Sequence, residues 1–346
     1  MKRILGVLAA ALVACGLVAA PAGAAVVVTD PLAGTVAGAQ EVAAFWLGEG
    51  GANLANATPY DVQTAIGGEV VPVGDLPIET KPGSVPPLPL EEPGQPDVTT
   101  PPSAGKVFFV GADGLPHYCS GTSVNSQYRN LVATAGRCTY DLQDGTTLDK
   151  WVFVPGYSAG TLPWGLYVGK QAFTHADFRT YGDHDRDYAF VTVYRGVISS
   201  ASGQLTDTGR LSDNVGAQGL AFNRPMGTSV DVFGYPAGAH PDGSRPYTGA
   251  TIETSSGPTS AVAVPSLPAD GLVRVDSGFT GAGSLGSSWL SSYSEAQRVG
   301  YLTGITIGVA DTDGDLRYDT SVSPYFDTQL STVFSAAKSS WTGGIA

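Results

Sequence analysis

Charged and sulfur-containing residues are both scarce in this chain of 346 residues. Only 14% of the residues are charged, and there are three cysteines, four histidines and two methionines. Acidic residues outnumber basic ones by 31 to 18, which gives a formal net charge of −13. An acidic surface favours solubility and repels phosphate groups, so nucleic acid and anionic membrane surfaces are not expected partners. Because cysteine and histidine are so few and so scattered, the sequence offers no cluster of the kind that binds zinc.

The one long apolar run lies at the N-terminus, where residues 1–25 are expected to form a signal peptide. Lys2 and Arg3 precede an Ala-rich apolar stretch over residues 4–20, and Ala22-Gly23-Ala24 supplies a small-residue cleavage pattern. No second apolar run follows that could span a membrane, so the protein is expected to be secreted, without a transmembrane segment. An alternative remains open, because Leu12-Val13-Ala14-Cys15 resembles a bacterial lipobox and would anchor the protein by a lipid on Cys15.

Two cysteines remain beyond the expected signal peptide. Cys119 and Cys138 form an even pair in a protein expected to be exported, so a disulfide is predicted between them. By the loop-entropy estimate such a bond would stabilise the fold by roughly 3 kcal/mol.

Three regions are expected between the signal peptide and the C-terminus. Residues 26–66 are mixed in composition, with a short helix predicted around residues 39–47. Residues 67–104 hold ten prolines, which excludes regular helix and central strand and indicates an extended linker. Residues 105–346 alternate short β-type runs with Gly, Asp and Asn turns, typical of a sandwich or barrel.

The predicted strands and one final helix define an all-β domain that ends in an α-helix. Leu330, Val333, Phe334 and Ala337 fall at i, i+3, i+4 and i+7, one face of a helix. The clearest strands are predicted over residues 106–110, 130–134, 151–154, 188–194, 229–235, 272–275 and 301–309.

The residues around the two cysteines carry a family resemblance. Cys119-Ser120-Gly121 precedes Thr134-Ala135-Gly136-Arg137-Cys138, and the chain resembles trypsin-like serine proteases, in which Cys-Ser-Gly leads to Thr-Ala-(Ala/Gly)-His-Cys. The runs 151–157, 221–223, 232–237 and 242–245 look like the secreted V8/trypsin-like proteases of bacteria. The resemblance covers about residues 105–337. It implies a chymotrypsin-like double six-stranded β-barrel behind a signal peptide, a pro-like segment and a Pro-rich linker.

The same resemblance assigns three catalytic positions, and the chain departs from the family at the first. The family's His falls on Arg137, whose guanidinium has no acceptor lone pair and stays protonated, so it cannot act as a general base. Asp187, fifty residues further on at the start of a hydrophobic run, matches the family's Asp. A solvated acid at the start of a strand is the alternative reading of Asp187.

The position of the family's nucleophilic serine is ambiguous. Aligning on Trp289 places Leu285 there, within Gly283-Ser284-Leu285-Gly286. A rival register uses Ser277 in Asp276-Ser277-Gly278, and Ser284 is a further candidate. Since the loop also departs from the family's glycines, the backbone N–H groups that would hold an oxyanion are in doubt.

No other residue restores the missing base in an obvious way. The four histidines are expected to be surface or structural residues, and His184, three residues before Asp187, is the first substitute to consider. Loss of a triad base typically lowers kcat on the order of 10⁴- to 10⁶-fold.

One acidic loop resembles a calcium-binding loop. Asp311, Asp313, Asp315 and Asp319 lie within nine residues with a glycine among them. The spacing differs from that of an EF-hand, and an acidic surface turn is the alternative. Calcium is therefore a weak candidate ligand, and no other cofactor is expected.

Three functions are compatible with the sequence. The favoured one is an inactive protease homologue that binds a peptide or protein ligand. A residual or active serine endopeptidase using Ser277 or Ser284 is the second, and a structural cell-surface protein is the third.

Overall fold

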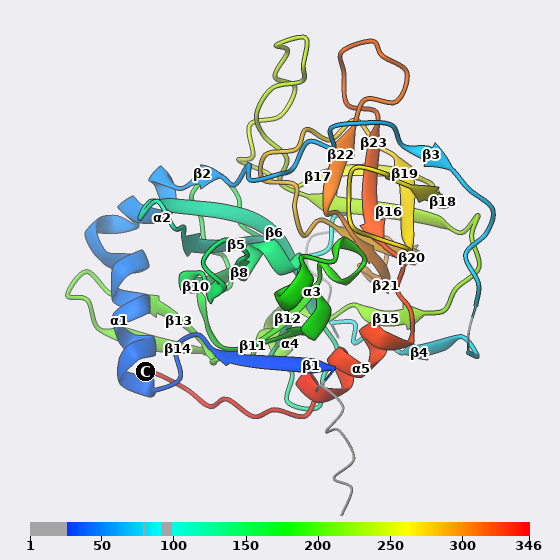
Figure 1. Cartoon of the computed structure of the whole chain (residues 1–346). Helices are drawn as coiled ribbons and strands as arrows, with labels where there is room; N and C mark the ends of the chain where they lie inside the picture. The colour runs from blue at the N-terminus through cyan, green and yellow to red at the C-terminus, as the bar shows by residue number, and fades with distance from the viewer. Residues whose placement is uncertain (1–25, 79, 91–98) are drawn as a thin grey trace, which may run out of the picture.

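The computed structural model describes residues 26–78, 80–90 and 99–346, which form two β halves side by side (Figure 1). The predicted signal peptide and Cys15 lie outside the described residues. Within the described part of the chain, no helix combines the length and hydropathy that a membrane crossing requires.

Six antiparallel strands close the first half into a barrel. The strands pair in the order β10–β5–β6–β7–β12–β11, and β11 pairs back onto β10 to close the ring. Their runs of Val, Phe and Ala suit a pleated, buried surface, and these side chains fill the barrel. The bounds are β5 (Ala104–Val110), β6 (Pro116–Val124), β7 (Leu131–Thr134), β10 (Asp149–Pro155), β11 (Tyr167–His175) and β12 (Ala189–Val193).

The second half is a half-barrel built from two open sheets. One sheet follows the order β17–β16–β20–β21–β15, in which β15 pairs parallel with β21, and the other follows β22–β23–β19–β18. The bounds are β15 (Gly219–Phe222), β16 (Ser229–Gly234), β17 (Glu253–Pro258), β18 (Ser260–Ala263), β19 (Leu272–Asp276), β20 (Ser288–Ser294), β21 (Val299–Ile305), β22 (Gly308–Ala310) and β23 (Thr320–Pro324). The run predicted as one strand over residues 301–309 is thus divided between β21 and β22, which belong to different sheets.

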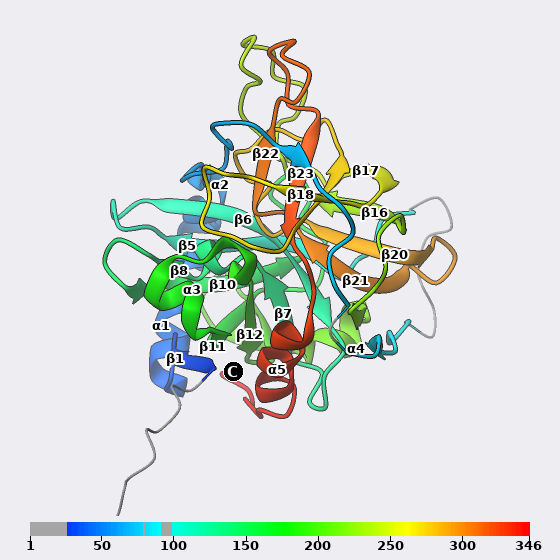
Figure 2. The ribbon, with the colours of Figure 1, turned by 45° about the vertical axis from the view of Figure 1, so that its right-hand side comes forward.

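The predicted C-terminal helix is present as α5 (Thr328–Ala337). Asp327 caps it by accepting a hydrogen bond from the N–H of Leu330, as short polar residues do at helix N-termini. Its apolar face is buried, with the ring of Phe334 centred 5.5 Å from that of Phe190 in the barrel. Figure 2 shows α5 beside β12 of the first barrel.

The residues before the barrels pack onto both halves. β1 (Val27–Pro31) pairs with β11, and α1 (Val36–Leu47), the helix predicted around residues 39–47, buries Trp46 against the first barrel. The chain then runs across the molecule to the second half (Figure 1). There β3 (Val71–Pro72) pairs with β18 and β4 (Gly83–Val85) with β15, so the described part of the Pro-rich stretch is extended and adds short edge strands.

The smaller elements complete the chain. Cys119 on β6 and Cys138 form the predicted disulfide, and both are buried. The remaining elements are α2 (Ala52–Asn56), β2 (Thr58–Pro59), β8 (Tyr140–Asp141), β9 (Thr146–Thr147), α3 (Ala176–Tyr181), β13 (Gly196–Ser199), β14 (Leu205–Gly209), α4 (Leu211–Val215) and the 3₁₀ turns η1 (Gly48–Gly50), η2 (Gly136–Cys138) and η3 (His184–Arg186).

Candidate functional site

Arg137 and Asp187, two of the three residues predicted from the resemblance, form a buried pair between the halves. Arg137 lies in η2, directly after β7 and held to β6 by the disulfide of its neighbour Cys138. Asp187 follows η3 and leads into β12. The carboxylate accepts two bonds from the one residue: Oδ1 from the backbone N–H of Arg137 at 2.9 Å, and Oδ2 from its Nε at 2.6 Å. Asp187 is 0% exposed and Arg137 3% exposed.

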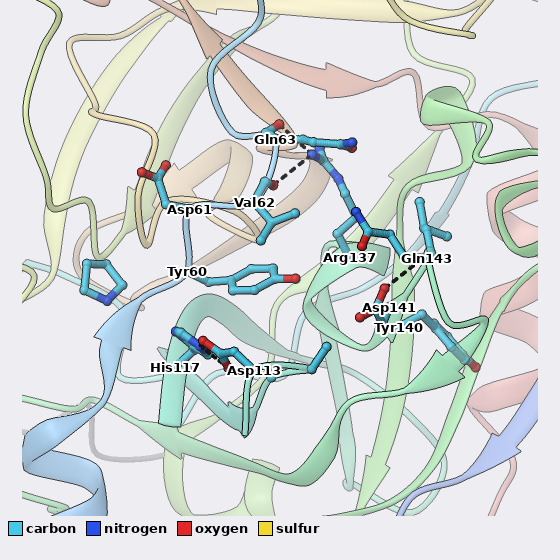
Figure 3. Close-up of a pocket in the computed structure, with 14 residues that line it drawn as sticks. Tyr60, Asp61, Val62, Gln63, Asp113, His117, Arg137, Tyr140, Asp141 and Gln143 are labelled. Carbon is cyan, nitrogen blue, oxygen red and sulfur yellow. Dashed lines mark hydrogen bonds and ion pairs between the residues drawn. The ribbon is translucent and has the colours of Figure 1, made fainter. Parts of the chain in front are cut away.

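The rest of the Arg137 guanidinium binds main-chain carbonyl groups. Nη1 donates to the carbonyl oxygens of Gln63 at 2.6 Å and Val62 at 3.4 Å (Figure 3). Nη2 donates to the carbonyl oxygen of Ile307. Ile307 lies at the break between β21 and β22. The side chain therefore joins the first barrel, the second half and the N-terminal segment. It is a cation saturated with acceptors and, with no lone pair to offer, cannot accept a proton.

Main-chain hydrogen bonds join the loop predicted to carry the nucleophile to β6 and to the residues between β21 and β22. The carbonyl of Leu285 accepts a hydrogen bond from the N–H of Ser120 at 2.8 Å, and the N–H of Gly286 donates to Thr306 at 2.8 Å. Leu285 is fully buried and belongs to the main hydrophobic core. At Gly286, with φ +84°, a Cβ would lie 2.1 Å from the carbonyl oxygen of Ser120, so the turn requires glycine.

The rival serines are engaged in local hydrogen bonds. The hydroxyl of Ser284, 0% exposed, donates to the carbonyl of Gly281 at 2.8 Å. The hydroxyl of Ser277 accepts from the N–H of Phe279 at 3.4 Å. Among the described residues, neither serine hydrogen-bonds to a histidine, so these bonds supply no base to activate either hydroxyl.

His184, the first substitute base to consider, lies in η3 beside the Arg137–Asp187 pair. Its backbone N–H donates to the carbonyl of Pro268, and its carbonyl accepts from the N–H of Asp187. Burial and then repulsion from the Arg137 cation lower the pKa of its imidazole below the usual value. Its contact with Asp187 is thus through the main chain, and the Asp187 carboxylate is taken by Arg137.

The site also includes a segment that sequence reasoning did not single out. The N–H of Gly283, in the loop where the resemblance expects oxyanion donors, donates to the carbonyl of Tyr60 at 3.0 Å. The carbonyls of Val62 and Gln63 bind Arg137. No side-chain pattern marks residues 60–66, because these contacts are made by their main chain.

A cavity of about 410 Å³ opens beside Arg137 and this segment. The ring of Tyr60 lies across it, and Asp61, Asp113 and Asp141 supply carboxylates on its rim (Figure 3). Burial raises the pKa of Tyr60 to about 12, and the charge of Asp141 adds to this effect. The cavity is therefore acidic at its rim, while the guanidinium of Arg137, which also lines it, is paired with Asp187.

A second buried cation was also missed. Lys106 on β5 is 4% exposed, and its Nζ lies 3.4 Å from the ring centre of Tyr118 and 4.5 Å from that of Tyr157. Burial lowers the pKa of Lys106 to about 7, while the surrounding ring faces favour the charged amine. The rings of Tyr118 and Tyr157 thus surround the amine where β5 meets the second half. Tyr235, which follows β16 in the second half, donates its hydroxyl hydrogen to the carbonyl of Tyr157.

The acidic loop between β22 and β23 lies apart from this site. Carboxylate oxygens of Asp311, Asp313 and Asp315 lie within 4.8 Å of one another. They accept hydrogen bonds from the loop's own N–H groups, and Asp319 binds Thr312 instead. Calcium binding stays a prediction.

Solved structures provide the comparison. A thermostable serine protease, AL20, from an extremophilic microorganism is 25% identical, with a TM-score of 0.57 over 70% of this chain and 100% of that one. The protease Anisep from Arthrobacter nicotinovorans is 25% identical, with a TM-score of 0.54 over 75% of this chain and 100% of that one. A Glu endopeptidase is 17% identical, with a TM-score of 0.51 over 71% and 95%.

These likenesses rest on structure, since no protein-family model and no curated protein sequence matches the chain. They agree with the closed six-stranded barrel, the half-barrel, the C-terminal helix and the Cys119–Cys138 disulfide. The predicted all-β, chymotrypsin-like architecture is confirmed. The chain therefore has the chymotrypsin/trypsin-like fold and is similar to bacterial serine proteases.

Proposed function

We propose that this protein is a catalytically inactive homologue of trypsin-like serine proteases. It would bind a peptide or protein ligand in the cleft between its two halves, defined here by Arg137, Gly283 and Val309, the residues that residues 60–66 contact. The observation that carries the proposal is the saturated, buried bonding of Arg137 at the predicted position of the base. A proton acceptor is needed there during acyl transfer, and an arginine bound to Asp187 and three carbonyl groups offers none.

The proposed nucleophile position supports the same function. Leu285 carries no hydroxyl, and its side chain lies in the core, away from solvent. Two of the three proposed catalytic positions thus hold residues that cannot perform the chemistry. The backbone groups of Gly283 and Val309, which would pair with a bound peptide, hydrogen-bond to residues 60–66 of the same chain.

The hydrolysis test compares three full chains: the unmodified protein, the variant Arg137→His, and the variant Arg137→His with Leu285→Ser. Each is incubated with fluorescent casein and with a fluorophosphonate probe, alongside an active trypsin-like protease. We expect no turnover and no label from the first two. Turnover by the unmodified chain, or label on its Ser277 or Ser284, would overturn the proposal in favour of a serine endopeptidase.

The binding test asks for retention of peptides from a diverse library by the same full chain. Retention that is lost when Asp113, an exposed residue on the rim of the cavity, is changed to lysine would support binding at this site. If no form of the chain retains any peptide, the remaining alternative is a structural protein whose barrels serve as a scaffold, and calcium-dependent stability would then be the next measurement.

Export, by secretion or by a lipid on Cys15, is part of the proposal and rests on the sequence alone.

A further inference from the structure

We propose that residues 60–66, here called the cleft segment, are an internal ligand of the cleft and exclude other peptides until they are displaced. The exclusion of a foreign peptide rests on the proposed function. The seating of the segment itself rests on contacts that are independent of that function.

Four main-chain hydrogen bonds hold the two ends of the cleft segment. At one end, the N–H of Tyr60 donates to the carbonyl of Tyr118 at 2.9 Å, and the carbonyl of Tyr60 accepts from Gly283 at 3.0 Å. At the other end, the N–H of Ile66 donates to the carbonyl of Val309 at 2.8 Å, and the N–H of Val309 donates to Thr64 at 2.9 Å. The segment therefore bridges the two halves of the molecule as an added strand would.

Arg137 holds the middle of the cleft segment. Its Nη1 binds the carbonyls of Gln63 and Val62, and Gln63 adopts a left-handed backbone, φ 52°, that few non-glycine residues take. The side chain at the predicted base position thus acts as a clamp for peptide carbonyl groups, anchored through its Nε on Asp187.

Two glycines in the wall of the cleft leave room for the side chains of this segment. A Cβ on Gly281 would lie 2.5 Å from Oγ1 and 2.9 Å from Cβ of Thr64, and a Cβ on Gly308 would lie 2.9 Å from Cγ1 of Ile66. Thr64 is 2% exposed, whereas Val62 is 45% exposed. The segment thus buries Thr64, packs Ile66 against Gly308 and turns Val62 outward, while its main chain makes the hydrogen bonds.

The direction of the segment defines what a displacing peptide would look like. Residues 58–59 pair parallel with β6, and Ala65 pairs parallel with Val309. A partner would therefore be an extended peptide that runs in this direction and presents a small residue where Thr64 lies. As an intramolecular ligand the segment acts at an effective concentration on the order of millimolar, so a free peptide competes poorly with it.

The test compares two full-chain variants that receive the same new residue. Thr64→Arg cannot fit beside Gly281 and should release the segment, while the cleft itself is unchanged. Val62→Arg is the matched control, because that side chain already points outward. The probe is a fluorescent synthetic peptide with the sequence of residues 57–68, and a second peptide carries the same Thr→Arg change.

We expect the amide hydrogens of Gly283 and Val309 to exchange about ten-fold faster or more in Thr64→Arg than in the unmodified chain or in Val62→Arg. We expect Thr64→Arg to bind the native probe about ten-fold more tightly or better than the unmodified chain or Val62→Arg does, and none of the three proteins to bind the changed probe. Equal exchange at Gly283 and Val309 in all three proteins would overturn the inference.

Foreign peptides from the library separate this inference from the proposed function. If Thr64→Arg binds the native probe but no foreign peptide, the internal-ligand inference stands and the proposed function fails. If the unmodified chain and Thr64→Arg retain foreign peptides equally, the proposed function stands and the inference is overturned.

Discussion

Nε of Arg137 lies 2.6 Å from Oδ2 of Asp187, and both side chains are almost completely shielded from water. The same carboxylate also accepts the backbone N–H of Arg137. A buried carboxylate is stable only when paired and hydrogen-bonded. In this protein the pair therefore joins the ends of β7 and β12, and the bond from Arg137 to the carbonyl of Ile307 extends this link to the second half.

Replacing Arg137 by methionine should strongly destabilise the fold. Asp187 would keep a buried negative charge without its partner, at a cost of about 3–5 kcal/mol in the free energy of unfolding. Urea unfolding of the full chain measures this loss. The double variant Arg137→Met with Asp187→Leu should recover much of it, because no charge then remains buried. A double variant as unstable as the single one would contradict the role of the pair.

Replacing both Cys119 and Cys138 by serine should lower stability by roughly 3 kcal/mol, since the unfolded chain would regain the freedom of a nineteen-residue loop. The strands on either side should remain paired, because their hydrogen bonds do not depend on sulfur. Thermal unfolding with and without a reductant measures the difference. An unmodified chain whose unfolding is insensitive to the reductant, when thiol labelling shows that the bond has been reduced, would argue against this estimate.

Stability should rise with pH between about 7 and 10 because of Lys106. In the folded protein burial lowers the pKa of its amine to about 7, whereas in the unfolded chain the amine keeps its ordinary value of 10.5. The unfolded state therefore binds more protons throughout this window, so stability increases as the pH rises. Below pH 7 both states are protonated, and the dependence on Lys106 disappears.

The variant Lys106→Met should remove this rise, and the exposed Lys81→Met is its control. Chemical unfolding at a series of pH values measures both. A Lys106→Met protein that retains the full rise between pH 7 and 10 would show that another group is responsible.

Replacing Gly286 by alanine should destabilise the loop that carries Leu285. The new Cβ would approach the carbonyl of Ser120 to 2.1 Å and would also be strained at φ +84°. We expect a loss of several kcal/mol, on the order of that for overpacking combined with left-handed strain. Gly67→Ala is the control, because open space surrounds that position. Equal unfolding midpoints for the two variants would contradict the geometry.

The sequence predicted much of the fold because the relevant signals are local. Alternating and apolar runs marked the central strands, and the spacing of Leu330, Val333, Phe334 and Ala337 marked α5. The break between β21 and β22 was not predictable, because residues 301–309 read as one continuous β-type run. Only the pairing of its two parts with different sheets divides it at Thr306 and Ile307.

For the site, the sequence by itself determined that the residue before Cys138 is an arginine, and so that this position cannot accept a proton. It also determined the pairing of the two cysteines and the acidic charge. Only the tertiary structure decided what Arg137 does instead: it binds Asp187, the carbonyl of Ile307 and the carbonyls of a segment about seventy residues earlier in the chain. The physical reason is that residues 60–66 are held by their main-chain N–H and carbonyl groups. Every residue type except proline carries a main-chain N–H and a carbonyl group, so no pattern of side chains predicts that a segment will occupy the cleft.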